Sequence, residues 1–306
     1  MSMIQKSLDR TILIMDGPMG TMVQAANLAE QDFRGSRFES HSIPLQGNND
    51  VLSLTKPNLI KRIHMEFLEA GANIICTNTF NATSIAQSDY CLEEFVYELN
   101  KRSAEIAKTA VREYCASQGE SLDHYVAGVI GPTNKTASIS PNVEDPAARG
   151  VSFEELVASY KEACQGLLDG GVDLLMIETV FDTLNAKAAI FAIETSLSER
   201  EMKLPLIISG TITDKSGRTL TGQTVEGFWN SVRHAEPMAI GLNCALGAKD
   251  LKPYIEDLSR MADCFVSIHP NAGLPNEMGE YTESADYMAD ILGGFAKNKL
   301  VNIVGG

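Results

Sequence analysis

Short apolar runs recur along the 306-residue chain, each followed by a loop rich in Gly, Thr or Asn and then by a stretch with helical periodicity. Apolar runs that alternate with helices are typical of parallel strands buried on both faces of a sheet. Eight such runs occur, namely TILIMDG from Thr11, ANIICTNT from Ala72, YVAGVIGPT from Tyr125, VDLLMIET from Val172, LPLIISGTI from Leu204, PMAIGLNC from Pro237, DCFVSIHPN from Asp263 and LVNIVGG from Leu300. The pattern therefore predicts eight parallel strands.

Helix signals lie between these runs. The stretch PNLIKRIHMEFLEAG carries one apolar stripe and ends at Gly71, which predicts an amphipathic helix. Ser152 followed by Glu155 is a capping-box pattern for a second helix, and that helix is expected to close at Gly170. Asp182 is expected to cap the next one. We predict seven helices between the eight strands.

Strands and helices in this alternation predict an α/β fold, a (β/α)8 TIM barrel formed as a single domain by residues 1–306. A doubly wound open sheet is the alternative, and it would normally bring a glycine-rich phosphate loop. No GxGxxG follows the first run, and no GxxxxGK[ST] occurs in the sequence. The eighth helix of a barrel would follow Gly306, so we expect the chain to be a fragment of a larger multidomain enzyme, cut at the exit of strand eight.

The composition narrows the class of protein. Hydrophobic residues make up 44% and charged residues 21% of the chain, and 40 acidic against 25 basic residues give a net charge of -15. This charge repels phosphate backbones and anionic lipids, which disfavours nucleic acid and membrane partners. The sequence has neither an apolar stretch of roughly 18 residues nor a signal peptide, so we expect a cytoplasmic protein. Its six scattered cysteines predict free thiols.

In a barrel of this kind, reactive groups sit where strands end and loops begin. Asp16 and Glu178 lie at the exits of strands one and four. Two such acids could grip a ligand ammonium, act as acid and base, or satisfy buried loop amides. Gly17 leaves a backbone N–H open to a ligand carboxylate. Together these residues suit a zwitterionic amino acid.

Cys244 lies at the exit of strand six, whereas Cys76 and Cys264 fall inside apolar runs and are expected to be core thiols. Three interpretations of Cys244 stay open: a small buried hydrophobe, a nucleophile with His269 as its base, or a metal ligand. A zinc site needs more ligands than this one thiol. No lysine lies at a strand exit, which disfavours Schiff-base chemistry.

Several blocks of sequence resemble the homocysteine-binding, N-terminal module of cobalamin-dependent methionine synthase, from about residue 11 to the last residue. They are DGPMGT, RGSRF, GNNDVLSLTKP, ANIICTNTFNATSIAQ, GPTNKTASISP, DLLMIETVFDTLNAKAA, SGTITDKSGRTLTGQT, GLNCALG and HPNAGLPNEMGEY. The resemblance implies an eight-stranded barrel that binds homocysteine through zinc held by three cysteines. One matches Cys244, and the other two are expected as an adjacent pair just after Gly306.

The resemblance also implies a substrate site. Asp16, Gly17, Thr77 and Glu178 match positions that hold the amino and carboxylate groups of homocysteine, and Asn243, beside the metal ligand, completes the expected substrate-binding set. One departure is visible, because the family usually reads DGGMGT and this chain has DGPMGT. Since proline lacks an N–H and fixes φ, we expect this turn to be stiffer or to hold the substrate carboxylate differently.

Zinc would deprotonate the homocysteine thiol and leave it nucleophilic. By resemblance, this sulfur accepts a methyl group from methylcobalamin to give methionine, and methyltetrahydrofolate recharges the cobalamin. The expected partners are the cobalamin-binding and folate-binding modules of the same polypeptide. We expect this chain alone to be catalytically poor and to bind zinc weakly. The alternatives are a stand-alone homocysteine methyltransferase that uses betaine or S-methylmethionine, and a non-catalytic amino-acid-binding module.

Overall fold

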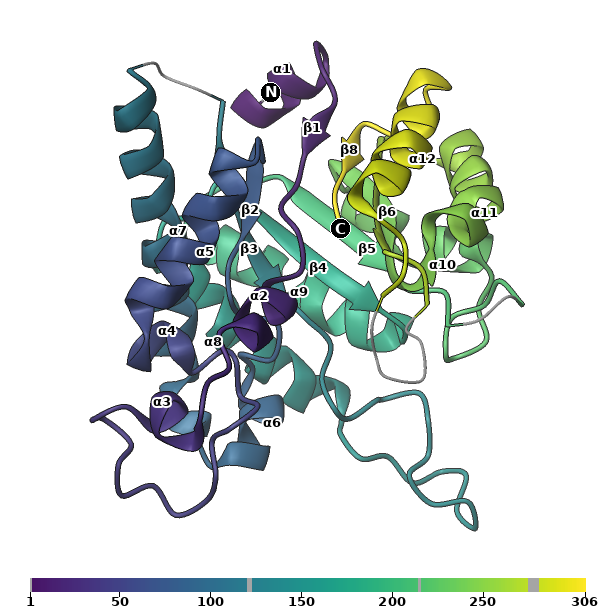
Figure 1. Ribbon diagram of the computed structural model, residues 1–306. Coiled ribbons are helices and arrows are strands. Elements are labelled where there is room, and N and C mark those ends of the chain that lie inside the picture. The colour runs from purple at the N-terminus through teal and green to yellow at the C-terminus, as the bar shows by residue number, and fades with distance from the viewer. Residues whose placement is uncertain (1, 120–122, 214–215, 275–280) are drawn as a thin grey trace.

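Figure 1 shows the computed structural model, which describes residues 2–119, 123–213, 216–274 and 281–306. Parts of the SGTITDKSG and HPNAGLPNEMGEY blocks, residues 214–215 and 275–280, therefore lie outside the described residues.

The strands form one eight-stranded sheet in the order β1-β8-β7-β6-β5-β4-β3-β2, and all seven neighbouring pairs are parallel. They are β1 (Leu13–Ile14), β2 (Ile74–Cys76), β3 (Tyr125–Ile130), β4 (Leu174–Val180), β5 (Leu206–Gly210), β6 (Ala239–Gly247), β7 (Phe265–Asn271) and β8 (Ile303–Val304). Six of them lie within a predicted run, whereas β4 extends one residue past its run, to Val180, and β6 extends three residues past its run, to Gly247. A bridge between Met15 and Ile74 joins the two edges of the sheet. The predicted TIM-type barrel is confirmed, and the open sheet is excluded.

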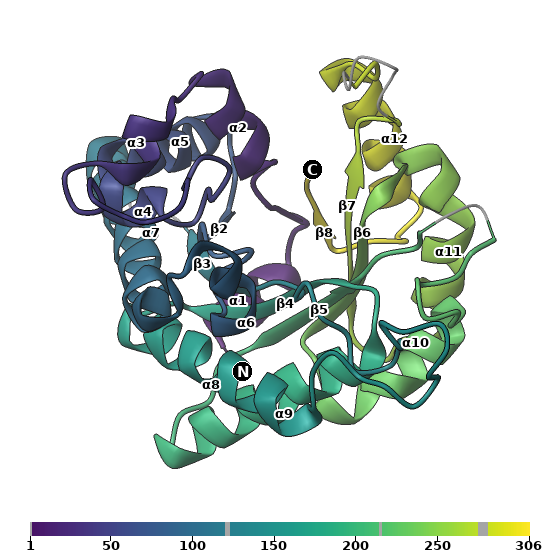
Figure 2. The ribbon, with the colours of Figure 1, turned by 90° about the horizontal axis from the view of Figure 1, so that it is seen from below.

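Helices surround the strands, as Figure 2 shows in a view onto the strand exits. They are α1 (Met3–Leu8), α2 (Met19–Ala25), α3 (Glu30–Arg34), α4 (Leu52–Thr55), α5 (Pro57–Glu69), α6 (Ser84–Gln87), α7 (Val96–Gln118), α8 (Phe153–Asp169), α9 (Thr183–Glu199), α10 (Val225–Val232), α11 (Ala248–Met261) and α12 (Ala285–Lys297), with 3₁₀ helices η1 (Ser88–Tyr90), η2 (Glu93–Phe95) and η3 (Arg233–Ala235). The prediction of seven intervening helices was too simple, because the first two crossovers contain additional short helices.

The predicted helix caps are confirmed. The Ser152 hydroxyl accepts a hydrogen bond from the Glu155 backbone N–H, and the Glu155 carboxylate accepts one from the Ser152 N–H, at 3.2 and 2.8 Å. This reciprocal pair begins α8, which ends at the cap residue Gly170. Asp182 caps α9 by accepting a hydrogen bond from the Leu184 N–H at 2.8 Å. These caps fix where the helices start relative to the strand exits.

Apolar side chains fill the inside of the barrel. A cluster that includes Leu13, Ile74, Leu174 and Ile303 joins alternate positions of the strands, and Ile4 of α1 belongs to the same cluster. Helix α1 thus packs across the end of the barrel where the strands begin. A larger cluster lies between the strands and the outer helices. The interior is therefore a packed core, and its polar end lies at the strand exits.

Candidate functional site

Polar residues follow the apolar ones at the strand exits. In β4, Leu174 and Met176 belong to the interior cluster, and Glu178 is the next residue in the alternation. Ser209 follows Ile207 in β5 in the same way, and Asn243 continues the alternation of β6. Since side chains of a strand alternate between its two faces, these polar groups form the upper layer of the barrel interior.

Asp16 lies just after β1 and is only 8% exposed. Its carboxylate accepts a hydrogen bond from the Cys76 backbone N–H at 2.8 Å, and its own N–H donates to the Ile74 carbonyl at 2.9 Å. Burial raises the pKa of Asp16 to about 7, although the hydrogen bond from Cys76 opposes this shift. A carboxyl group with this pKa is only partly ionised at neutral pH.

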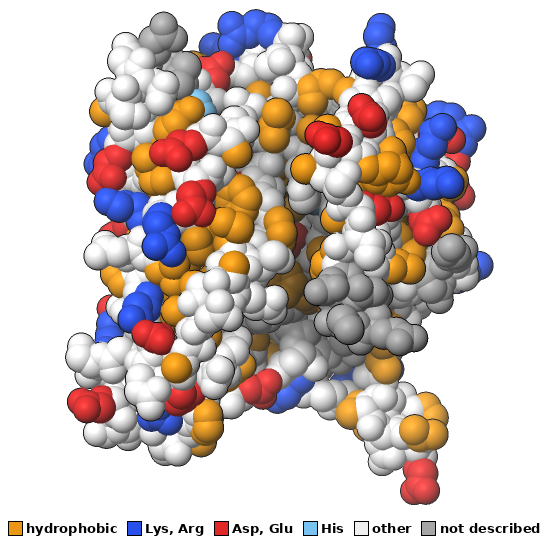
Figure 3. Space-filling model, viewed as in Figure 1, with side chains coloured by type: hydrophobic (Ala, Val, Ile, Leu, Met, Phe, Trp, Pro, Cys, Tyr) orange, Lys and Arg blue, Asp and Glu red, His pale blue; other side chains and the backbone are white. Residues whose placement is uncertain are grey.

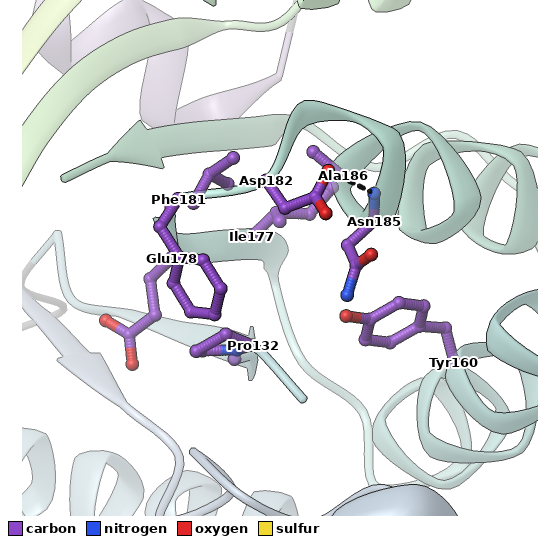
Figure 4. Close-up of a pocket in the computed structure, with 10 residues that line it drawn as sticks. Pro132, Tyr160, Ile177, Glu178, Phe181, Asp182, Asn185 and Ala186 are labelled. Carbon is purple, nitrogen blue, oxygen red and sulfur yellow. Dashed lines mark hydrogen bonds between the residues drawn. The ribbon is translucent and has the colours of Figure 1, made fainter. Parts of the chain in front are cut away.

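Glu178 is the second acid of the site. Burial and, to a smaller extent, the nearby charge of Asp16 together raise its pKa to about 7. In Figure 4 the Glu178 carboxylate points away from Phe181, Tyr160 and Asn185. Among the described residues, neither Asp16 nor Glu178 forms an ion pair with a basic side chain. Two acids without a cation, Asp16 buried and Glu178 half-buried, favour a ligand that brings positive charge.

Cys76 confirms a prediction only in part. The sequence placed it among core thiols, and it does pack against the interior apolar cluster, but it is half-buried and lies next to Asp16 at the last position of β2. Burial and the charges of Asp16 and Glu178 raise the pKa of its thiol well above the usual value. This thiol therefore belongs to the site.

Thr77 is 4% exposed, and its hydroxyl is largely used by the protein. Its Oγ1 accepts a hydrogen bond from the Val129 N–H at 2.9 Å and lies 2.7 Å from Oγ1 of Thr79. The Thr79 hydroxyl donates to the Val129 carbonyl, so the hydrogen between the two threonines comes from Thr77. Thr77 is left with a lone pair, which suits an ammonium group better than a carboxylate.

Gly17 and Pro18 form the turn after β1. A Cβ added at Gly17 would lie 2.9 Å from the Phe67 ring, so this position has little room for a side chain. Pro18 is the N-cap residue of α2, with φ -73° and ψ 101°. This φ is within the range that proline prefers, and an N-cap position requires no helical N–H bond. Proline thus fits this turn without backbone strain.

Cys244 lies at the exit of β6, as expected, and is half-buried. Its Sγ lies 3.1 Å from Nδ2 of Asn243, which donates a hydrogen bond to it. Both Cys244 and Ala245 have left-handed backbones, with φ of 58° and 57°. The register between β6 and β7 shifts between Asn243 and Gly247, so Cys244 lies in a bulge. Bulges redirect side chains, and they occur often beside active sites.

His269 pairs in register with Asn243 on the neighbouring strand. Its Nε2 is buried without a hydrogen-bond partner, and burial lowers the pKa of the imidazole to about 4. The ring is therefore neutral at pH 7. The described residues contain no hydrogen bond between His269 and Cys244, so they do not assemble the cysteine–histidine pair of a nucleophilic site.

The described residues also provide a test of the zinc expectation. At this exit they supply one candidate thiol ligand, Cys244. No group of three His, Cys, Asp or Glu side chains within the described ranges could hold a metal ion. This donor set does not by itself fit a zinc site, which normally takes three or four protein ligands. We therefore derive no step through a metal ion.

A small cavity lies behind Glu178, between the exits of β3 and β4 (Figure 4). Its volume of about 10 Å³ leaves room for about one water molecule. Asp182 and Asn185 line it and hold the loop after β3, because Asp182 accepts a hydrogen bond from the Ser138 hydroxyl at 2.7 Å and Asn185 accepts one from the Ala137 N–H at 2.9 Å. The residues that line the cavity support one wall of the site, and the cavity itself is too small for an amino acid.

Sequence reasoning missed Ser209, and it placed Thr179 at the exit of the fourth strand without assigning it a role. Ser209 is fully buried, and its hydroxyl donates to Oδ1 of Asn243 at 2.6 Å. Thr179 has φ 56°, and its N–H and hydroxyl both form hydrogen bonds with the side-chain amide of Asn243. Ser209 falls inside an apolar run, where its position two residues after Ile207 was a signal for an inward-facing side chain. Nothing in the local sequence of Thr179 indicates a left-handed backbone.

The outer surface gives little further indication of partners. Figure 3 shows acidic and basic side chains interspersed over the outer helices on the face in view. Within the described ranges, each helix is too short or too polar to cross a bilayer.

The sequence matches the homocysteine S-methyltransferase family over residues 13–306. Among solved structures, the metallated form of the homocysteine methyltransferase MmuM from Escherichia coli superposes with a TM-score of 0.75 at 22% identity, covering 99% of this chain and 94% of that one. The oxidized form of MmuM gives 0.75 at 21% identity, with coverage of 98% and 92%. These likenesses show the shared fold. With its family match extending over nearly the whole barrel, the chain belongs to the homocysteine S-methyltransferase family.

Proposed function

We propose that the chain binds homocysteine at the strand exits and presents the sulfur for S-methylation, which gives methionine. The observation that carries this proposal is the pair of acids, the buried Asp16 and the half-buried Glu178, which share the strand-exit end of the barrel with the Cys244 thiol. The substrate ammonium would lie between the two carboxylates, where its charge would lower the pKa of both. Thr77 would add its free lone pair, and the Gly17 N–H would bind the substrate carboxylate.

Methyl transfer needs the thiolate form of homocysteine, which is scarce at neutral pH because a free thiol has a pKa of about 8.5. A zinc ion would supply this activation, since a coordinated thiol is deprotonated, but the described residues do not by themselves hold one. We propose Cys244 as one zinc ligand, in line with the resemblance described above. The other ligands would have to come from outside the described residues.

For the methyl donor we propose methylcobalamin, recharged from methyltetrahydrofolate on cobalamin-binding and folate-binding modules of the same polypeptide. The GNNDVLSLTKP block supports this by resemblance. Its structural role is to hold the exit of β2, because the Asn49 carbonyl accepts a hydrogen bond from Asn78 at 2.8 Å and Asp50 accepts one from the Asn81 N–H at 3.0 Å. An enzyme using betaine or S-methylmethionine could need the same support, so the donor must be identified by assay.

The amino-acid site is tested by calorimetry with homocysteine. Glu178→Gln and Asp16→Asn should each weaken binding about tenfold or more, because each removes a charge-assisted hydrogen bond to the ammonium. Glu162→Gln is a matched control: burial also raises the pKa of this acid, which lies on α8. It should bind as the unmodified protein does. Unchanged affinity in both site variants would place homocysteine elsewhere.

The reaction is tested by measuring methionine formation with methylcobalamin, S-methylmethionine or betaine as the donor. Methionine from methylcobalamin alone would support the proposed donor, and methionine from either other compound would contradict it. Homocysteine binding without methionine formation does not by itself favour the non-catalytic amino-acid-binding module, because we expect this chain alone to be catalytically poor. Calorimetry with and without added zinc separates the two, since only a zinc-dependent site should bind homocysteine more tightly when zinc is present.

A further inference from the structure

Two bulges face each other across β5. The register between β4 and β5 shifts between Ile177 and Val180, and that between β6 and β7 shifts between Asn243 and Gly247. Within these bulges, Thr179 has φ 56° and Cys244 has φ 58°, a left-handed conformation that residues with a Cβ rarely adopt. Such backbones persist only where the surrounding structure holds them in place.

A single amide side chain connects the two bulges. Oδ1 of Asn243 accepts hydrogen bonds from the Thr179 N–H at 3.1 Å and from the Ser209 hydroxyl at 2.6 Å. Its Nδ2 donates to Oγ1 of Thr179 at 2.7 Å and to Sγ of Cys244 at 3.1 Å. Asn243 therefore links β4, β5 and β6 directly below the two residues that face the substrate site, Glu178 and Cys244.

These four contacts use the full hydrogen-bonding capacity of the amide. An asparagine side chain offers two acceptor positions on its oxygen and two hydrogens on its nitrogen. All of them meet protein atoms here, and Asn243 is only 3% exposed. The amide has no donor or acceptor left for a hydrogen bond to a substrate. If Asn243 contributes to substrate binding, as the sequence predicts, it must do so through its protein partners.

We propose that Asn243, held by Ser209, is a positioning residue that fixes the separation between the Glu178 carboxylate and the Cys244 thiol. This inference rests on the proposed function, in which those two groups hold opposite ends of homocysteine. A fixed separation selects for the length of the amino acid. Homocysteine has one methylene more than cysteine, and the linked bulges would discriminate between the two.

The test compares the binding of three probes by calorimetry: homocysteine, cysteine and 2-aminobutyrate, which matches homocysteine without its sulfur. Asn243→Ala should weaken homocysteine binding about tenfold, as expected for the loss of several buried hydrogen bonds. It should change 2-aminobutyrate binding less than about threefold, and the preference for homocysteine over cysteine should largely disappear. A direct substrate contact by Asn243 would instead weaken homocysteine and 2-aminobutyrate equally, which would overturn the proposal.

Ser209→Ala is a milder variant for the same test, since it removes one hydrogen bond and leaves the amide in place. It should lower the preference for homocysteine about threefold. In the double variant, Ser209→Ala should add nothing to Asn243→Ala, because Ser209 acts only through Asn243. An additive effect would contradict the proposed role. If Asn243→Ala fails to fold, the preference measured with Ser209→Ala decides.

The matched control is Asn100→Ala. Asn100 is also fully buried, and its Nδ2 donates to the carbonyls of Ala82, in the loop after β2, and of Val96, in the first turn of its own helix α7, at 2.7 and 2.8 Å. This variant should lose thermal stability and keep its preference for homocysteine. If Asn100→Ala lost the preference for homocysteine over cysteine to the same extent, the effect of Asn243→Ala would reflect a general loss of structure, and the proposed positioning role would be wrong. Failure of the unmodified protein to bind homocysteine would overturn the proposed function, whereas normal binding with unchanged preference in the variants would overturn only this inference.

Discussion

The backbone N–H of Cys76 donates a hydrogen bond to the carboxylate of Asp16 at 2.8 Å, which ties the exit of β2 to the exit of β1. These two strands are the edges of the sheet, and they are otherwise joined by a bridge between Met15 and Ile74. The contact therefore closes the barrel at the level of the site. It also brings a thiol next to the two acids.

Homocysteine affinity should rise with pH between about 6 and 8. The pKa values of Asp16 and Glu178 are both about 7, so below neutral pH these acids are largely neutral and hold an ammonium poorly. Binding near pH 7 should also release protons. Calorimetry in two buffers of different ionisation enthalpy measures this release.

Asp16→Asn supplies the control for this pH dependence. The Asp16 charge raises the pKa of Glu178, so its removal should move the midpoint of the remaining pH dependence downward. A midpoint that stays in place would show that the two carboxylates do not interact.

The same acids should lower the stability of the ligand-free protein as pH rises. Their pKa values in the folded state lie above the ordinary values of 3.8 and 4.5, so between about pH 4 and 7 the folded state holds protons that the unfolded state releases. Each group's contribution therefore falls across this window. Glu178→Gln should raise the melting temperature at pH 8 and weaken homocysteine binding. A lower melting temperature at pH 8 would contradict burial of an unpaired charge.

Thiol labelling should locate the site. Pulses of N-ethylmaleimide followed by mass spectrometry should modify the exposed Cys91 quickly and the buried Cys164 slowly. Saturating methionine, the proposed product, should protect Cys76 and Cys244 and leave the rate at Cys91 unchanged. Methionine has no free thiol, so it does not consume the reagent. Equal protection of Cys91 would indicate a global change in the protein and not occupation of the site.

Two glycine substitutions should have opposite effects on stability. A Cβ at Gly131 would lie 2.1 Å from the Phe80 carbonyl oxygen, so Gly131→Ala must displace the loop after β2. We expect a loss of about 1–3 kcal/mol, with weaker homocysteine binding. Gly294 lies in α12, where a Cβ would meet nothing within 4 Å, so Gly294→Ala should gain about 0.5–1 kcal/mol. Urea unfolding measures both changes.

Local patterns predicted the barrel because each strand and helix carries its own signal. Each of the eight strands overlaps one of the eight runs, although β4 and β6 extend past theirs, and Ser152 and Asp182 cap the helices that their neighbours indicated. Cys76 packs against the interior cluster as predicted, but its hydrogen bond to Asp16 could not be predicted because it joins strands that are distant in the sequence. The four contacts of Asn243 could not be predicted, since they depend on the register of neighbouring strands and on bulges that leave no sequence pattern. The identity of a buried polar residue is visible in a sequence, but its partners are not.

Helix α1 packs its Ile4 and Leu8 into the interior cluster, at the end opposite the strand exits. Homocysteine and methionine would then both enter and leave through the strand-exit end of the barrel. Methionine would have to dissociate before the next homocysteine binds. For a site that is open at one end only, steady-state kinetics should show methionine as a competitive inhibitor with respect to homocysteine.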